Sequence, residues 1–163
     1  MADKGVKKTN AMRALEAKHI PYEAFTYSPD IHSADEVAAA LGIPARQVYK
    51  TLVALPDRGR PLLVMLGGDR EMDPRRVAKA IGAKRVEMAP KREAERLTGL
   101  LVGGIGALAL LGKPLDVYLD RPALGEEWIL VNGGQRGLNL KLRVADLVSV
   151  TGAKAIEASA EPA

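Results

Sequence analysis

A strand that is apolar on both faces is the feature that most constrains the fold of this chain. Residues 48 to 55 read VYKTLVAL, and side chains along a strand alternate between its two faces. Both faces are mostly apolar here, which is typical of a strand covered on each side within a sheet. The turn sequence PDRGR at 56 to 60 and the apolar run at 62 to 66 then predict a hairpin. We therefore expect this hairpin to lie inside a sheet.

The other predicted elements alternate single helices with hairpins. A second hairpin is expected from strands at 128 to 131 and 138 to 142, which flank the turn sequence NGG. Helix start signals occur at Thr9 or Asn10, at Ser33 with Glu36 in a capping box, at Asp73 with Pro74, and at Pro90. This order favours an α+β fold with a mixed sheet over a regular βαβ series. With 163 residues, 47% of them hydrophobic, we expect one domain, with loose tails at residues 1 to 8 and 153 to 163.

Lys50 is the main candidate for a functional residue. It shares its strand face with Val48, Leu52 and Ala54, so its ammonium group must be paired, must reach solvent, or must lose its proton. Lysines placed in this way are often functional. The plain alternative is a lysine near the strand end that reaches solvent past Tyr49, and the pattern alone favours neither.

Two glycine-rich segments are candidate binding loops. Gly103, Gly104 and Gly106, with Ile105 between them, allow close backbone approach, and exposed N–H groups in such a loop hold an oxyanion or a phosphate. The segment NGGQRG at 132 to 137 is a hairpin tip whose arginine is suited to a phosphate or a carbonyl group. For the first segment a tight turn is at least as good an explanation, and for the second a plain turn is the simpler one.

Several catalytic and cofactor-binding classes are excluded by the residues present. The chain has no cysteine, its two histidines lack a third ligand at useful spacing, and no serine lies in G-x-S-x-G. Residues 104 to 109 match G-x-G-x-x-A, but Gly112 and Pro114 end any helix that follows, and no P-loop sequence occurs. We therefore predict neither a metal site nor a bound cofactor.

The charge balance is mildly basic. Lys and Arg number 24 against 20 Asp and Glu, which gives +4 and permits an anionic partner without requiring one. Residues 70 to 96 carry nine basic and five acidic residues, which indicates solvated helix faces or a weak footprint for a nucleic-acid backbone. The first ten residues lack the apolar region of a signal peptide, and no apolar run reaches the roughly 20 residues of a membrane span. We expect a cytoplasmic protein without membrane contact, and a monomer by default.

Three segments of the chain, taken in order, resemble one known family. The segments are VYKTL at 48 to 52, KRVEM at 84 to 88 followed by TG at 98 to 99 and VGGI at 102 to 105, and VNGGQRGL at 131 to 138. In sequence, order and spacing they are similar to the motifs of the YbaK/EbsC family of aminoacyl-tRNA deacylases. The resemblance covers roughly residues 9 to 152 and implies one YbaK-type domain over them, a mixed, curved sheet with flanking helices.

The resemblance also implies a function. The family cleaves the ester that joins a wrong amino acid to tRNA, often cysteine or alanine on tRNA(Pro), and it resembles the editing domain inserted in bacterial prolyl-tRNA synthetases. Members act in trans on the 3′ end of mischarged tRNA, and some associate with prolyl-tRNA synthetase. In cysteine-specific members the thiol of the substrate itself is thought to attack the ester, so neither a protein nucleophile nor a metal is needed.

Site residues follow from the same resemblance. Lys50 matches the family's essential lysine, Thr51 its neighbour in the pocket, and Tyr27 a pocket tyrosine. Lys50 would hold the tRNA 3′ end through phosphate or ribose contacts, and the glycine loop would donate backbone N–H groups to the ester carbonyl. The expected catalytic residues are Lys50, Gly104, Ile105 and Gly106, and the expected substrate-binding residues are Tyr27, Thr51, Gly103, Gly133, Gly134 and Arg136.

One departure from the family pattern bears on substrate choice. The family commonly has G-G-[IT]-S-P-[LF]-G, whereas this chain has Gly106 and Ala107 in place of the Ser-Pro pair. We expect a looser or wider pocket floor, so cysteine specificity does not follow from the resemblance. Two alternatives remain open. One is a non-catalytic module that binds an aminoacyl or nucleotide group in the same pocket, and the other is a structural or partner-binding protein whose Lys50 reaches solvent.

Overall fold

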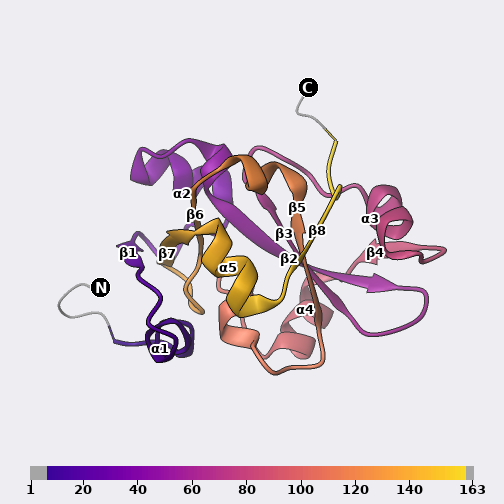
Figure 1. The fold of residues 1–163 in the computed structure, drawn as a ribbon, viewed down its shortest axis with the longest axis horizontal. Helices are drawn as coiled ribbons and strands as arrows, with labels where there is room; N and C mark the ends of the chain where they lie inside the picture. Colours follow the sequence, from indigo (N-terminus) through magenta and orange to yellow (C-terminus); the bar gives the residue numbers. More distant parts are fainter. Residues whose placement is uncertain (1–6, 161–163) are drawn as a thin grey trace.

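The hairpin predicted at residues 48 to 66 lies inside the larger of two sheets. In the computed structural model, which describes residues 7–160, β2 (Tyr49–Pro56) pairs antiparallel with β3 (Leu62–Gly67). The strand order is β4-β2-β3-β5-β8, and β5 and β8 run parallel to β3 (Figure 1). The bounds of the other strands are Val86–Met88 for β4, Asp116–Asp120 for β5 and Lys154–Ile156 for β8. The sheet is therefore mixed and the fold is α+β, as predicted.

The second predicted hairpin forms the smaller sheet together with a strand from early in the chain. β6 (Trp128–Asn132) pairs antiparallel with β7 (Leu138–Arg143), and β7 pairs antiparallel with β1 (Glu23–Thr26). A bridge between Val48 and Leu130 connects the start of β2 with β6. The smaller sheet therefore lies beside the end of β2 that carries Lys50.

Short helices connect the strands. Within residues 7–160 the α-helices are α1 (Asn10–Ala17), α2 (Ala34–Leu41), α3 (Pro74–Ile81), α4 (Lys91–Thr98) and α5 (Val144–Thr151), and the 3-10 helices are η1 (Ala45–Gln47), η2 (Ala107–Leu110) and η3 (Arg121–Gly125). Each α-helix has eight residues. A membrane-spanning helix needs about 20, and none of the helices in the described part of the chain is long and apolar enough to serve as one.

Polar side chains fix where the helices begin. The Thr9 hydroxyl accepts a backbone N–H of α1 at 3.2 Å, and the Asp73 carboxylate accepts one of α3 at 3.0 Å, so both predicted starts are confirmed. Ser33 is the N-cap of α2, but its hydroxyl donates to the Glu36 carboxylate at 2.5 Å instead of accepting a backbone N–H. The predicted capping box is therefore not formed: Ser33 and Glu36 are joined through their side chains instead.

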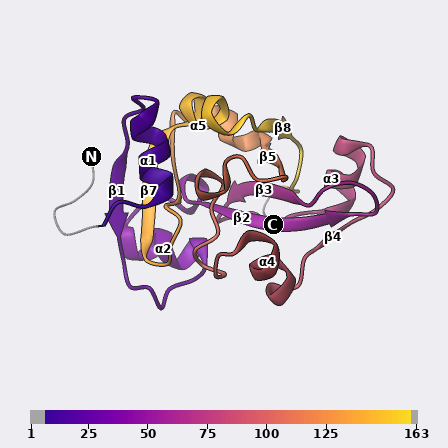
Figure 2. The same cartoon turned by 90° about the horizontal axis from the view of Figure 1, so that it is seen from below.

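The core lies on both faces of the larger sheet. β3 is buried along its whole length, and its side chains alternate between two apolar clusters. Leu63 and Met65 pack in the main cluster with side chains of α1, α4 and α5, whereas Val64 packs on the other face with Val77 and Ala78 of α3. Figures 1 and 2 show α1 and β1 at one end of the molecule and α3 and β4 at the other. The central hairpin runs along the long axis, from the middle of the molecule toward the end that holds α3 and β4.

The prediction of a loose tail from residue 153 is wrong for the described part of that segment. Lys154–Ile156 form β8, which pairs with β5 and is itself an edge strand of the larger sheet. Beyond β8, the buried carboxylate of Asp120 accepts the backbone N–H of Ala158 at 2.9 Å and the hydroxyl of Ser159. Asp120 thus anchors this segment, which local sequence patterns do not reveal. The other predicted tail falls mostly on residues 1–6, which lie outside the described residues, as do residues 161–163.

Candidate functional site

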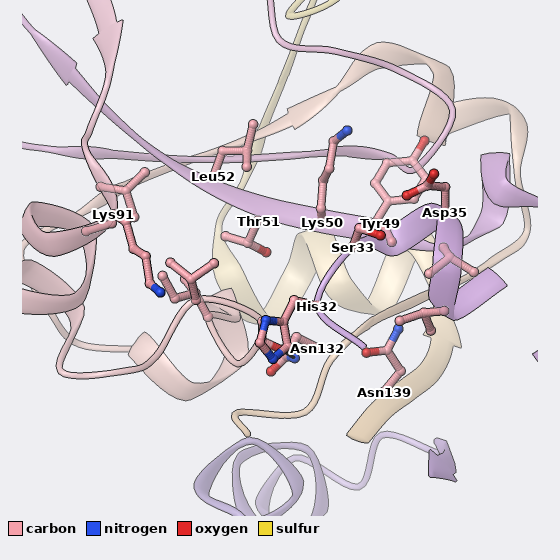
Figure 3. Close-up of a pocket in the computed structure, with 18 of the residues that line it drawn as sticks. His32, Ser33, Asp35, Tyr49, Lys50, Thr51, Leu52, Lys91, Asn132 and Asn139 are labelled. Carbon is pink, nitrogen blue, oxygen red and sulfur yellow. Dashed lines mark hydrogen bonds between the residues drawn. The ribbon is translucent and has the colours of Figure 1, made fainter. Parts of the chain in front are cut away.

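A cavity of about 380 Å³ opens beside β2. Its lining comes from β2, from the segment before α2, from the junction between β4 and α4, from the glycine loop at 102 to 105, and from β6 and β7 (Figure 3). These segments are far apart in the sequence, and the two sheets bring them together. The lining is more apolar than polar, with a few polar groups in it, which is typical of a small-molecule site.

The cavity gathers half of the predicted site residues. Those that line it are Tyr27, Lys50, Thr51, Gly103 and Ile105, and those that do not are Gly104, Gly106, Gly133, Gly134 and Arg136. The second group still adjoins the cavity. Gly104 and Gly106 belong to the glycine loop itself, and Gly133, Gly134 and Arg136 belong to the hairpin that packs behind this loop. The two groups therefore have different surroundings.

Lys50 is half-buried, and its ammonium group is hydrogen-bonded to a neutral carbonyl oxygen. Its ammonium group donates to the Arg70 carbonyl oxygen at 2.5 Å, and it forms no ion pair with any residue in 7–160. In Figure 3 its side chain points to the side of β2 opposite that of Thr51. A neutral carbonyl satisfies one donor and leaves the positive charge in place.

Lys50 also acts on a carboxylate at the edge of the cavity. The pKa of Asp35 lies below its usual value, chiefly because of the Ser33 hydroxyl, and the positive charge of Lys50 adds a smaller lowering. Both Ser33 and Asp35 line the cavity near the start of α2. One end of the cavity is therefore charged.

Tyr27 provides a neutral hydrogen-bonding group. Its hydroxyl donates to the Asn139 side-chain oxygen at 3.1 Å, and burial raises the pKa of Tyr27 to about 12. The phenol therefore stays protonated at neutral pH. Asn139 is buried and also lines the cavity, and sequence analysis missed it. The strand reads LNLKLR, so Asn139 shares a face with Lys141 and Arg143, and no signal in the sequence sets it apart from a solvent-facing residue.

The β6–β7 hairpin holds the glycine loop in place. Asn132 donates to the Gly103 carbonyl oxygen at 2.8 Å, and Arg136 donates through Nε to the Val102 carbonyl oxygen at 2.8 Å. We call Asn132 and Arg136 the loop clamp. The N–H and C=O of one trans peptide point in opposite directions, so fixing the Val102 oxygen also fixes the direction of the Gly103 N–H. In this structure Arg136 is a support behind the loop.

The backbone N–H groups of the glycine loop differ in their availability. The Gly104 N–H donates to the Leu101 carbonyl oxygen at 2.7 Å, so the loop itself uses it. The N–H groups of Gly103 and Ile105 have no acceptor within residues 7–160, and both residues line the cavity. Two donors of this kind can stabilise negative charge that develops on a carbonyl oxygen.

Gly106 explains the departure from the Ser-Pro pattern. A Cβ atom built on Gly106 would lie 2.7 Å from the Asn132 carbonyl oxygen. The loop therefore packs directly on the hairpin at this residue, and a serine would force the two apart.

Two further side chains, those of His32 and Lys91, stand at the cavity, and neither is among the predicted site residues. Gly103 packs under the His32 ring, since a Cβ on it would lie 3.2 Å from the ring, and a ring nitrogen of His32 lies 3.1 Å from the Pro29 carbonyl oxygen. Lys91, the first residue of α4, points toward the cavity in Figure 3. Within residues 7–160 no group of His, Asp and Glu side chains is suited to a metal ion.

Comparison with known proteins finds similar chains and similar folds. Residues 28–150 match the family described as the aminoacyl-tRNA editing domain. Over 147 residues the chain is 35% identical to an Enterococcus faecalis protein provisionally named Cys-tRNA(Pro)/Cys-tRNA(Cys) deacylase EbsC, covering 89% of each. It is 33% identical to the proline–tRNA ligase of Nitratidesulfovibrio vulgaris over 134 residues, which are 82% of this chain and 22% of that enzyme.

A solved structure has the same fold over its whole length. It is provisionally described as a trans-editing enzyme for prolyl tRNA synthetase, and it superposes with a TM-score of 0.79 at 25% identity. The superposition covers 96% of this chain and all of the other.

Proposed function

Because the chain belongs to the aminoacyl-tRNA editing domain family, we propose that it is a trans-editing deacylase for mischarged tRNA(Pro). Its substrate is the ester that joins cysteine or alanine to the 3′ end of this tRNA. The names given to the Enterococcus faecalis relative and to the matching solved structure support this substrate class. The similarity to part of a proline–tRNA ligase supports prolyl-tRNA synthetase as a partner.

One observation carries the proposal beyond family membership. Lys50, Tyr27 and two backbone N–H groups that have no acceptor within residues 7–160 line a single cavity of about 380 Å³, and the Lys50 side chain leaves β2 on the side opposite that of Thr51. A cation, a neutral hydroxyl and a pair of N–H donors are the groups needed to hold a phosphate, a ribose and an ester carbonyl. The editing domain is 9–152 in this proposal, with β8 packed against it.

The proposed reaction is hydrolysis of the ester by water. Water adds to the ester carbonyl carbon, the bond from that carbon to the ribose oxygen breaks, and the ribose oxygen leaves with one proton as the free hydroxyl of tRNA. The second proton is released when the new carboxyl group ionises. Negative charge that develops on the carbonyl oxygen is stabilised by the N–H groups of Gly103 and Ile105.

Lys50 and Tyr27 position the substrate in this mechanism. The Lys50 ammonium group holds the 3′ end through its phosphate or ribose, while Thr51 and Tyr27 contact the aminoacyl group. Holding the ester in the reactive orientation lowers the barrier to hydrolysis, and this effect does not require a protein nucleophile. Gly104 and Gly106 shape the loop that carries the two donors, and the hairpin with Gly133, Gly134 and Arg136 supports it.

A deacylation panel tests the proposal. Cys-tRNA(Pro), Ala-tRNA(Pro) and Pro-tRNA(Pro) are each incubated with the wild type, with Lys50→Ala and with Lys154→Ala, which removes an exposed lysine of β8 as a control. We expect loss of one mischarged species, sparing of Pro-tRNA(Pro), retention of activity in Lys154→Ala and loss of activity in Lys50→Ala.

The same panel identifies the alternative. If the protein binds charged tRNA and cleaves no species, the chain is a non-catalytic module that uses the same cavity, and the Gly106-Ala107 sequence is the first place to look for the cause. Full activity in Lys50→Ala would refute the role given to that lysine.

A further inference from the structure

Positive charge is concentrated at one end of the molecule. Residues 74 to 85, which span α3 and reach β4, contain five Lys or Arg and no Asp or Glu. Residues 9 to 48, which form α1, β1 and α2, contain three Lys or Arg and five Asp or Glu. Figures 1 and 2 show that α3 and β4 lie at the end of the molecule opposite α1 and β1. The small net charge of the chain therefore hides a strong asymmetry.

Most cations at this end form no ion pair in the part of the chain that the structure describes. Arg75, Lys79, Lys84 and Arg85 are exposed, and no side chain of theirs forms an ion pair within residues 7–160. The exception in this segment is Arg76, whose guanidinium lies near Asp73 and Glu157. Like charges that gather without counter-charges repel one another, which favours binding of a polyanion.

Three of these cations line a hollow between α3 and β4. It has a volume of about 430 Å³, and Arg75, Lys84 and Arg85 line it. Two carboxylates are also present there, those of Asp57 and Glu87. The Asp57 carboxylate accepts the backbone N–H groups of Lys84 at 3.0 Å and Arg85 at 3.3 Å, so it serves to fix the turn before β4.

The hollow and the functional cavity share two strands. Along β2, the cavity is lined as far as Val53 and the hollow begins at Leu55. Along β4, Glu87 lines the hollow and Met88 lines the cavity. Since a strand rises about 3.3 Å per residue, the two sites are neighbours. Lys91 stands at the cavity just beyond β4 and continues the row of cations.

From this arrangement we infer that α3, β4 and the start of α4 bind the phosphate backbone of the tRNA acceptor arm. The basic track is Arg75, Lys79, Lys84, Arg85 and Lys91, and this inference rests on the proposed function of the cavity. Duplex nucleic acid carries a negative charge about every 1.7 Å along its axis, so an ester at the end of such an arm arrives beside many phosphates. The track neutralises some of them while the 3′ end enters the cavity.

The test compares two variants of equal charge. In the track variant Arg75, Lys84 and Arg85 are each changed to Gln, and in the control Arg13, Lys18 and Lys154, which are exposed and lie outside the track, are changed to Gln. Binding of uncharged tRNA is measured from low to high salt. Each phosphate contact contributes about 0.9 to the slope of log affinity against log salt, so we expect the track variant to lose about 2 to 3 in slope. The control should keep the wild-type slope.

A short substrate separates this inference from the proposed function. Turnover is measured on mischarged tRNA and on the same amino acid esterified to a CCA trinucleotide. We expect the track variant to show a raised KM for tRNA and wild-type turnover of the trinucleotide ester. If the wild type cleaves neither substrate, the proposed function fails, and the salt slopes still decide whether the track binds RNA.

Three results would overturn the inference. The first is equal slopes for the track variant and the control, and the second is an equal loss of turnover on both substrates. The third is unchanged tRNA binding together with loss of binding to prolyl-tRNA synthetase, which would make the track a protein-binding surface.

Discussion

At the scale of single residues, the loop clamp decides how the glycine loop presents its donors. Arg136 contacts a carbonyl oxygen of the loop from behind, at 2.8 Å, and does not line the cavity. We therefore expect any effect of Arg136 on the reaction to pass through the peptide between Val102 and Gly103, as that of a positioning residue. A donor that moves by a fraction of an ångström loses most of its effect on the transition state.

We predict that Arg136→Lys lowers kcat by about 10-fold to 100-fold and changes KM by less than about twofold. Lysine keeps the charge but cannot place a donor where Nε lies. Steady-state kinetics on the mischarged tRNA provide the measurement, with Arg13→Lys on α1 as the control. A raised KM at constant kcat would instead mean that Arg136 binds substrate directly, as the sequence suggests.

Tyr27 gives the site a measurable pH dependence of stability. Burial raises the pKa of Tyr27 from about 10 to about 12, so the folded protein resists ionisation that the unfolded chain accepts. The stability that this provides is fully present below pH 10 and is lost as the pH rises through 12.

We therefore predict that the wild type loses stability relative to Tyr27→Phe between pH 10 and pH 12. Urea unfolding midpoints of both proteins, measured at steps from pH 8 to pH 12, provide the test. The other tyrosines and the lysines titrate in both proteins, so the difference isolates Tyr27. A gap that stays constant over this range would show that the Tyr27 phenol is not protected.

At the scale of elements, the glycine loop and the β6–β7 hairpin are packed as one unit. Gly106 is extended, with φ at −145°, so any residue can adopt its backbone conformation. What requires glycine is space, because a Cβ there would lie 2.7 Å from the Asn132 carbonyl oxygen. A larger residue at Gly106 must push the loop away from its clamp.

We predict that Gly106→Ala lowers the free energy of unfolding by about 1–3 kcal/mol, the usual cost of overpacking, and reduces turnover further than this loss explains. Gly125→Ala is the matched control, since nothing lies within 4 Å of a Cβ built there. Chemical denaturation and deacylation are measured on both variants. Equal behaviour of the two variants would mean that the loop shifts without cost.

The elements differ in how far the sequence reveals them. The two hairpins and the helix starts at Thr9 and Asp73 follow from local patterns, because turn residues and caps act on their neighbours. The pairing of β1 with β7 and the anchoring of Ser159 by Asp120 do not, because their partners are distant in the sequence. The glycine loop stands out in the sequence because three glycines lie within positions 103 to 106, whereas the contact of Arg136 with Val102 does not, because these residues are 34 positions apart.

At the scale of the whole molecule, the segment after β8 is connected to Lys50. Asp120 holds Ser159, and Ser159 and the Ala160 carbonyl oxygen each lie 3.3 Å from the Arg70 guanidinium. The carbonyl oxygen of that same Arg70 accepts the hydrogen bond from Lys50. Four hydrogen-bonded residues thus connect the edge of the larger sheet to the cavity.

We predict that Asp120→Ala lowers the free energy of unfolding by about 1–3 kcal/mol, because two buried donors lose their acceptor. Asp116→Ala on the same strand removes an exposed ion pair with Arg60 at 3.2 Å and should cost about 1 kcal/mol or less. Urea denaturation of the two variants gives the comparison. A smaller loss in Asp120→Ala than in Asp116→Ala would show that the segment after β8 contributes no stability.

The hydrogen bond between Tyr27 and Asn139 joins residues 112 positions apart. Closing so long a loop costs chain entropy before the contact can stabilise the fold. Contacts between residues that are distant in the sequence therefore slow folding. We therefore expect the cavity to assemble late in folding. A refolding chain should regain its helices and local hairpins first and its deacylase activity later. For a time, a molecule with native secondary structure would therefore not yet correct errors of translation.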